Sequence, residues 1–215
     1  MTFTFRTASL DDYLRTHPLR EFFVRHLGIT AKQVRKFQDC LATSIDERPL
    51  QTLFEANPTL LVQHLHGSGR FVLPKKCLGS EFVPDFVIGE HHSFGYDWEL
   101  VELESPTIPF FTKAGNPRAQ LTHAIRQVQD WRAWLQRNQN YASRTRGESG
   151  LGLTDITANA PGLIIMGRRS LLDAGTNDRR RQMTTDLKIE IHTYDYLLER
   201  AQVAVVAAQN VGRAT

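Results

Sequence analysis

The chain has 215 residues, a formal net charge of +3 and a sequence pI near 9.0. Hydrophobic residues make up 41% of the chain and charged residues 23%, which is ordinary for a folded globular protein and excludes general disorder. This length suits one well-buried core better than two large independent domains. The mild basic excess is compatible with a polyanionic partner but does not identify one.

The sequence also favours a cytoplasmic location. No stretch approaches the roughly 20 apolar residues that cross a bilayer, and the N-terminal sequence lacks the basic-then-apolar layout of a secretory signal. Cys40 and Cys77 are the two cysteines, and in a chain of this size they are typical of reduced thiols in a cytosolic protein. We therefore expect no membrane span and no disulfide.

Residues 1–48 predict an N-terminal helical segment attached to a larger domain over residues 49–215. Two helices are expected in this segment, each after a capping residue: residues 11–28, capped by Ser9 or Asp11, and residues 31–44, capped by Thr30. The domain should begin with further helical turns. These cover residues 50–56 and, after the Asn57-Pro58 start signal, residues 59–66.

The rest of the domain predicts a mixed α/β fold. Between residues 70 and 105, short extended runs separated by glycine, proline and histidine predict a small antiparallel sheet. The elements expected after this sheet are an amphipathic helix from about Asn116, a surface loop over residues 141–160, a buried strand over 161–167, a polar helix over 178–185, a strand over 188–194 and a closing helix over 194–211.

Carboxylates are concentrated in two runs of the predicted sheet. Asp85 lies in one run, and Glu102 and Glu104 lie two residues apart in a later run, so that alternation places both glutamates on one face. If the two strands are neighbours, Asp85 approaches the same face, and such clustering is costly without a cation. Hard divalent ions such as Mg²⁺ or Mn²⁺ bind carboxylate and phosphate oxygens, and a bound metal activates water for phosphodiester hydrolysis.

The order Pro84-Asp85 followed by Glu102-Leu103-Glu104 resembles the PD-(D/E)XK nuclease motif. The last position departs from the family, which most often has a lysine there that orients the attacking water, although some restriction endonucleases of the same fold carry glutamate. The resemblance implies that Asp85 and Glu102 are the principal metal ligands, together with the backbone carbonyl of Leu103. Glu104 is then a further ligand or a water-orienting group.

Two features outside this motif fit the same resemblance. Gln127 and Trp131 lie one turn apart in the helix after the sheet, as in the Gln-x-x-x-Tyr element of RecB-like members, with tryptophan in place of tyrosine. Glu55 occupies the place of the acid that many members contribute from the first core helix. Both residues also have ordinary interpretations, Gln127 as a helix-flank amide and Glu55 as a solvated helix residue.

The wider pattern over about residues 49–204 is similar to the nuclease domain of the Shedu family of bacterial anti-phage defence proteins. That resemblance implies a restriction-endonuclease-like αβββαβ core, a divalent metal, DNA as substrate and assembly into homo-oligomers. It predicts a magnesium-dependent endonuclease. A module of the same fold that binds nucleic acid without cutting is the alternative, because of Glu104, and a third hypothesis treats the acidic strand as a solvated edge.

Basic residues near the motif are candidates for holding DNA phosphates. We place Lys113, Arg118 and Arg126 in this role, although each can equally be a solvated surface charge. Lys113 follows the acidic strand by a short loop and could place its ammonium where Glu104 has none. The histidines lack the spacing of a closed zinc site. Other residues that we considered for nucleic-acid contact are Lys75, Lys76 and the run Arg179-Arg180-Arg181.

Overall fold

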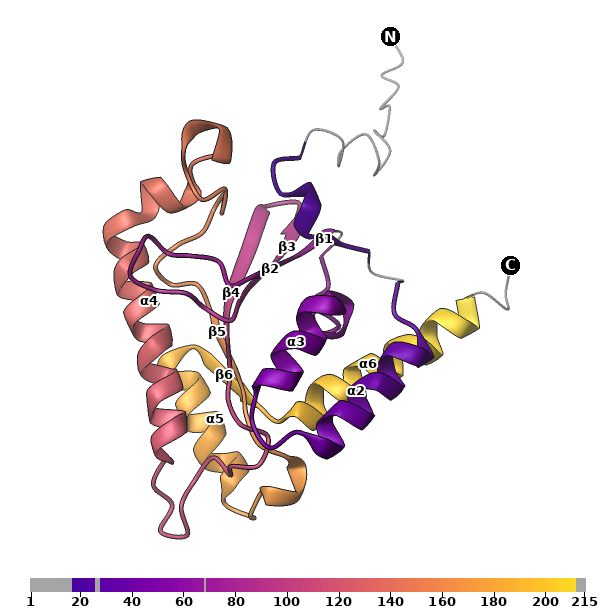
Figure 1. The fold of residues 1–215 in the computed structure, drawn as a ribbon. Coiled ribbons are helices and arrows are strands. Elements are labelled where there is room, and N and C mark those ends of the chain that lie inside the picture. The colour runs from indigo at the N-terminus through magenta and orange to yellow at the C-terminus, as the bar shows by residue number, and fades with distance from the viewer. Residues whose placement is uncertain (1–16, 26–27, 68, 212–215) are drawn as a thin grey trace.

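The structure, a computed structural model, describes residues 17–25, 28–67 and 69–211. Within this part of the chain, six strands form one mixed sheet in the order β1-β2-β3-β4-β5-β6. The strands from β1 to β4 pair in antiparallel fashion, whereas β5 and β6 are parallel to β4. Figure 1 shows the sheet between two layers, with α4 and α5 on one side and α2, α3 and α6 on the other. The predicted mixed α/β fold is confirmed.

The elements have the following bounds. The strands are β1 (Phe23–Val24), β2 (Gly69–Pro74), β3 (Phe86–His92), β4 (Gly95–Leu103), β5 (Gly162–Ile165) and β6 (Ile189–His192). The helices are α2 (Ala31–Thr43), α3 (Arg48–Ala56), α4 (Ala119–Ser143), α5 (Thr176–Leu187) and α6 (Tyr194–Val211). Short 3₁₀ turns are η1 (Arg20–Phe22), η2 (Pro58–Leu60), η3 (Arg146–Glu148) and η4 (Arg169–Leu171).

The sheet separates two hydrophobic cores. Alternate residues of β5 face opposite sides, so Ile164 packs in the α4 core and Leu163 packs in the core of α2, α3 and α6. Every residue of β5 is buried, which explains its unbroken apolar sequence. On β4, Leu100 belongs to the α4 core, so Glu102, two residues further on, faces the same side.

Several predicted elements are confirmed, with small shifts at their ends. Thr30 caps α2 through a capping box with Gln33. The amphipathic helix α4 runs on to Ser143, so the expected loop begins later than predicted. The strands expected near residues 161–167 and 188–194 are β5 and β6, and the polar and closing helices are α5 and α6.

The helix expected over residues 11–28 is wrong where the structure describes it. Residues 20–22 form only the 3₁₀ turn η1, and β1 then pairs with β2, with Phe23 opposite Phe71. Aromatic and β-branched residues fit a sheet edge well, so pairing with β2 outweighs any local helical tendency. The proposed caps Ser9 and Asp11 lie outside the described residues.

The helix expected over residues 59–66 is also wrong, because only the 3₁₀ turn η2 forms there. The consecutive residues Leu60, Leu61 and Val62 are all fully buried. A surface helix buries one stripe and exposes the residues between, so it cannot bury three neighbours at once. The N-terminal part is joined closely to the rest, since β1 extends the sheet and α2 packs with α6 in one core.

Among the described residues, none of the helices is both long enough and apolar enough to span a membrane. Cys40 and Cys77 are both free thiols.

Candidate active site

The carboxylates of the motif meet at one end of the sheet. Asp85 lies in the turn immediately before β3, rather than inside a strand as expected, and β4 ends beside it. The Asp85 carboxylate accepts a hydrogen bond from the Leu103 amide at 2.8 Å. This bond ties the turn before β3 to the end of β4, so the two halves of the motif, far apart in the sequence, become neighbours.

A pocket of about 600 Å³ opens where these segments meet. Its walls come from α3, the end of β2, the turn before β3, the end of β4 and the first turns of α4. The lining residues are Glu47, Arg48, Gln51, Thr52, Glu55, Lys75, Asp85, Glu102, Leu103, Glu104 and His123.

Glu102 is the carboxyl group of this pocket whose pKa is raised most. It is only 8% exposed. Burial, followed by repulsion from Asp85 and Glu104, raises the pKa of Glu102 to about 9, even though Lys75 and a hydrogen bond from Gln127 act in the opposite direction. A carboxyl group in these surroundings holds its proton at neutral pH unless a cation replaces it.

The pKa of Glu104 is raised for similar reasons, but by less. Burial, and then repulsion from Glu47 and Asp85, raises the pKa of Glu104 to about 7, while a hydrogen bond from the Ser105 amide lowers it. The carbonyl oxygen of Glu104 accepts a 2.8 Å hydrogen bond from the Tyr194 hydroxyl. That bond fixes the backbone just beyond β4 against the start of α6.

The donor set fits a hard divalent cation. Asp85, Glu102 and the Leu103 carbonyl offer oxygen ligands of the kind that Mg²⁺ and Mn²⁺ prefer. Two amide oxygens beside them, Oε1 of Gln51 and Oε1 of Gln127, are buried and have no hydrogen-bond partner among the described residues. Buried acceptors of this kind need a partner, and either a water molecule or an ion can supply it.

The side chains alone do not form a complete metal cage. Within residues 17–25, 28–67 and 69–211, no three His, Cys, Asp or Glu side chains are placed so that they could hold a metal ion. The PD-(D/E)XK pattern uses a smaller side-chain set, two carboxylates with a backbone carbonyl, and magnesium characteristically keeps several waters.

The structure brings some of the other predicted residues to the site and leaves others outside it. Gln127 reaches Glu102 with a hydrogen bond. Glu55 lines the pocket, where its carboxylate accepts a 2.6 Å hydrogen bond from Gln51. The basic residues proposed for phosphate contact, Lys113, Arg118 and Arg126, are exposed and lie outside the pocket lining.

Several lining residues were not predicted as members of the site, Glu47 and Gln51 among them, and Lys75 was considered only for nucleic-acid contact. Glu47, at the start of α3, is the acid that raises the pKa of Glu104 most. The sequence instead favoured Glu55, near the end of the same helix. Lys75 contacts the Asp85 carboxylate directly. Gln51 lies one helical turn before Glu55 on α3. The spacing of Glu47, Gln51 and Glu55, four residues apart, was the available signal for a polar helix face.

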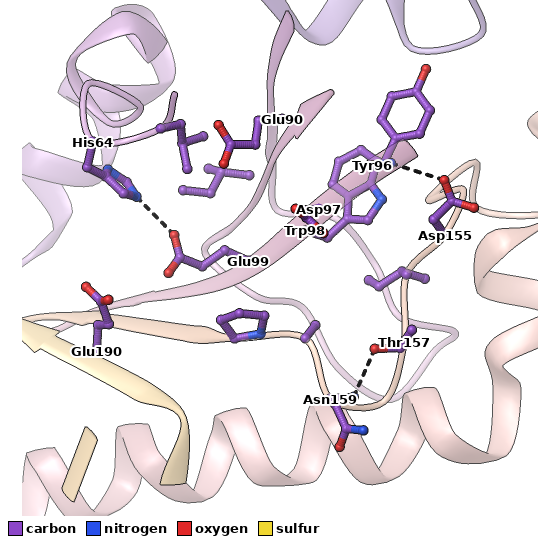
Figure 2. Close-up of a pocket in the computed structure, with 15 residues that line it drawn as sticks. His64, Glu90, Tyr96, Asp97, Trp98, Glu99, Asp155, Thr157, Asn159 and Glu190 are labelled. Atoms are coloured by element: carbon purple, nitrogen blue, oxygen red, sulfur yellow. Dashed lines mark hydrogen bonds and ion pairs between the residues drawn. The ribbon is translucent and has the colours of Figure 1, made fainter. Parts of the chain in front are cut away.

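A second pocket, of about 550 Å³, lies toward the other end of the sheet and also contains carboxylates, as Figure 2 shows. Hydrogen-bond donors meet these groups, and two of the contacts appear as dashed lines from Glu99 and Asp155. The pairs are Glu99 with the His64 ring at 3.0 Å, Glu90 with the His66 amide at 2.6 Å, Asp155 with the Tyr96 amide at 3.1 Å and Glu190 with the His192 ring at 2.8 Å.

The pKa values in this second pocket move in the opposite direction. Burial alone raises the pKa of Glu90, but hydrogen bonds from the Gly67 amide, His92 and the His66 amide outweigh it and hold the pKa below its ordinary value. A hydrogen bond with His192 is the main cause that lowers the pKa of Glu190. Hydrogen bonds from neighbouring groups therefore stabilise the charged forms of Glu90 and Glu190.

The mixed sheet, with Pro84-Asp85 and Glu102-Leu103-Glu104 meeting at its end, has the arrangement of the PD-(D/E)XK nuclease fold. Comparison with protein families identifies the group: residues 44–198 match the family model described as "Shedu protein SduA, C-terminal". The chain belongs to this family, as its sequence resemblance indicated. No curated protein matches the chain.

Among solved structures, the restriction endonuclease FokI bound to DNA matches with a TM-score of 0.43 and 12% sequence identity. The match covers 99% of this chain and 35% of the FokI chain.

Proposed function

We propose that this protein is a metal-dependent deoxyribonuclease that hydrolyses phosphodiester bonds, and that it acts in bacterial anti-phage defence. The observation that carries this proposal is the crowding of Asp85, Glu102 and Glu104 at the end of the sheet, with the pKa of Glu102 raised to about 9. Perturbed carboxylates in a pocket are a mark of functional sites. Membership of the Shedu family supports the defence role.

In this proposal, Asp85 and Glu102 hold Mg²⁺ or Mn²⁺ together with the Leu103 carbonyl. The bound ion would neutralise charge on the phosphate and lower the pKa of a water molecule. Gln127 donates a hydrogen bond to Glu102 and so orients that carboxylate. Glu104 is a further ligand or a water-orienting group, and its tie to Tyr194 supports it from behind.

The substrate and assembly follow as parts of the same proposal. DNA would lie across the open end of the sheet, and Glu55 would contribute from α3 to the polar wall of the pocket. Lys113, Arg118 and Arg126 are exposed cations that would hold the phosphate backbone on either side of the scissile bond. We also propose a cytoplasmic location and a homo-oligomeric state. Light scattering can check the oligomeric state.

The direct test is to incubate the purified protein with supercoiled and linear DNA in Mg²⁺, Mn²⁺ or EDTA. The variant Asp85→Ala, Glu102→Ala removes both principal ligands, and Glu99→Gln is the matched control. Glu99 is also an acid of β4, partly buried, but it belongs to the other pocket. We expect cutting by the wild type and the control in metal, and none in EDTA or by the double variant.

A module that binds DNA without cutting is the second candidate, and the observation that favours it is Glu104 at the usual lysine position. This candidate predicts that the wild type shifts DNA in a gel without cleaving it in either metal. It also predicts that the double variant binds DNA at least as well as the wild type, because acidic side chains have been removed from the site.

A further inference from the structure

Lys75 is placed against the motif by the register of the sheet. Strands β2 and β3 are antiparallel, and Pro74, the last residue of β2, lies opposite Phe86. The next residue on each side of that pair is therefore Lys75 opposite Asp85, and the Lys75 amide donates a 3.0 Å hydrogen bond to the Asp85 carbonyl. Their side chains also meet, because the Lys75 ammonium contacts the Asp85 carboxylate.

The backbone at Lys75 supports a specialised role. Its φ angle is +47°, in the left-handed region that residues with a side chain seldom adopt. Such conformations persist where the surrounding structure requires them, often at functional sites. Here the conformation ends β2 and leaves the Lys75 side chain in the pocket lining, half-exposed at 50%, while Asp85 is only 14% exposed.

The charge of Lys75 also acts on Glu102, another carboxylate of the motif. Besides pairing with Asp85, it lowers the pKa of Glu102 against the effect of burial and neighbouring acids. The position after Leu103 holds Glu104, so the motif itself supplies no ammonium. Lys113, the lysine that sequence proximity favoured for this task, lies outside the pocket lining.

We propose that Lys75 is a catalytic residue that takes over, from the end of β2, the role of the missing motif lysine. This inference rests on the proposed nuclease function. During hydrolysis, the water oxygen forms a bond to phosphorus as the bond to the leaving ester oxygen breaks. One water proton passes to solvent, and the leaving oxygen takes up a proton. Lys75 keeps its own proton and acts by donating a hydrogen bond to the attacking oxygen.

The test compares Lys75→Met, which keeps the length of the side chain without its charge, with Lys76→Met as the matched control. Lys76 is the adjacent lysine and lies outside the pocket lining. We expect Lys75→Met to lower kcat about 100-fold, the scale of removing one positioned donor, and Lys76→Met to stay within about threefold of wild type. Thermal melts and Mn²⁺ titration calorimetry should show both variants folded and able to bind metal.

A relocation variant tests the assignment more sharply. Lys75→Met combined with Glu104→Lys returns an ammonium to the usual motif position, and we expect it to recover about tenfold of the lost kcat. Lys75→Met that cuts within about threefold of wild type overturns the proposal. A loss of cutting that is matched by a loss of Mn²⁺ affinity also overturns it, because Lys75 would then only organise the ligands.

These outcomes are separate from failure of the nuclease function. A wild type that cuts no DNA in either metal rejects the nuclease and the role of Lys75 together. A wild type that cuts, alongside a Lys75→Met variant that cuts equally well, rejects Lys75 alone.

Discussion

The two pockets of this sheet both contain carboxylates, but the surroundings of these groups shift their pKa values in opposite directions. In the pocket of Figure 2, ring nitrogens and backbone amides meet the acids, and the pKa values of Glu90 and Glu190 are lowered. At the motif end, acids face one another, and the pKa values of Glu102 and Glu104 are raised to about 9 and about 7. Hydrogen-bond donors stabilise the charged acids of the Figure 2 pocket, whereas burial and repulsion destabilise the charged acids at the motif end.

The same contrast is seen between two acids of one strand, Glu99 and the proposed metal ligand Glu102. Glu99 and Glu102 lie three residues apart on β4 and point to opposite sides of the sheet. Glu99 has a histidine partner, while Glu102 lies among like charges. Local destabilisation at the motif end is therefore the physical trace of the proposed activity.

The largest expected difference between the pockets is in DNA cleavage. Glu102→Gln keeps the size of the side chain but removes a proposed metal ligand, so we expect kcat to fall about 1,000-fold, or about 4 kcal/mol of transition-state stabilisation. Glu99→Gln should stay within about threefold of wild type. Plasmid cleavage assays with both variants in Mg²⁺ check this, and equal losses in the two variants would remove the distinction between the pockets.

The next effect concerns stability against pH without metal. The pKa of Glu102 is raised from 4.5 to about 9, so the folded state binds more protons between these values. The free energy of unfolding should therefore fall as pH rises from about 4.5 to about 9. Glu102→Gln should remove much of this slope and be more stable than wild type at pH 8 by about 2 kcal/mol. Urea titrations in EDTA measure both, and a wild type that gains stability across this range would contradict the assignment.

Bound metal should offset this loss of stability by binding at the motif end alone. We expect saturating Mg²⁺ to stabilise the wild type by about 1–3 kcal/mol, through binding to the folded state only. The gain should vanish in Glu102→Gln and persist in Glu99→Gln. Thermal melts with and without Mg²⁺ provide the measurement, and a gain that survives in Glu102→Gln would place the ion elsewhere.

The smallest effect belongs to the second pocket. Glu90→Gln weakens the bonds from the His66 and Gly67 amides, and we expect a loss of about 1 kcal/mol at pH 7 with cleavage unchanged. Because the pKa of Glu90 is lowered, its contribution is present above about 4.5 and is lost as pH falls through the folded-state value. The difference in stability between the two proteins, measured by urea titration, should be smaller at pH 3 than at pH 7, and a difference that does not shrink would contradict this.

The sequence was sufficient for the family, the mixed fold and the meeting of Asp85 with Glu102. These features depend on local patterns: strand alternation, the spacing of two glutamates, and capping at Thr30. The β1 strand was missed because its formation depends on pairing with β2, a contact between residues distant in the sequence. Local periodicity has no information about such a partner.

The position of Lys75 was hidden for a similar reason. Its place opposite Asp85 follows from the register of β2 with β3, and sequence distance instead favoured Lys113. The choice between Glu47 and Glu55 depended on which end of α3 approaches Glu104, and that is set by how the helix packs on the sheet. The hydrophobic pattern of such a helix predicts which face packs on the sheet. It does not predict how far the helix is shifted along its own axis.

The pocket at the motif end draws on segments from Glu47 on α3 to Gln127 on α4, with Lys75, Asp85 and Glu102 between them. A chain still emerging from the ribosome holds only part of this set until α4 has been made and has packed against the sheet. Fragments produced by premature termination or proteolysis lack it as well. Under the proposed nuclease function, such incomplete copies would be unable to cut the DNA of the cell that makes them.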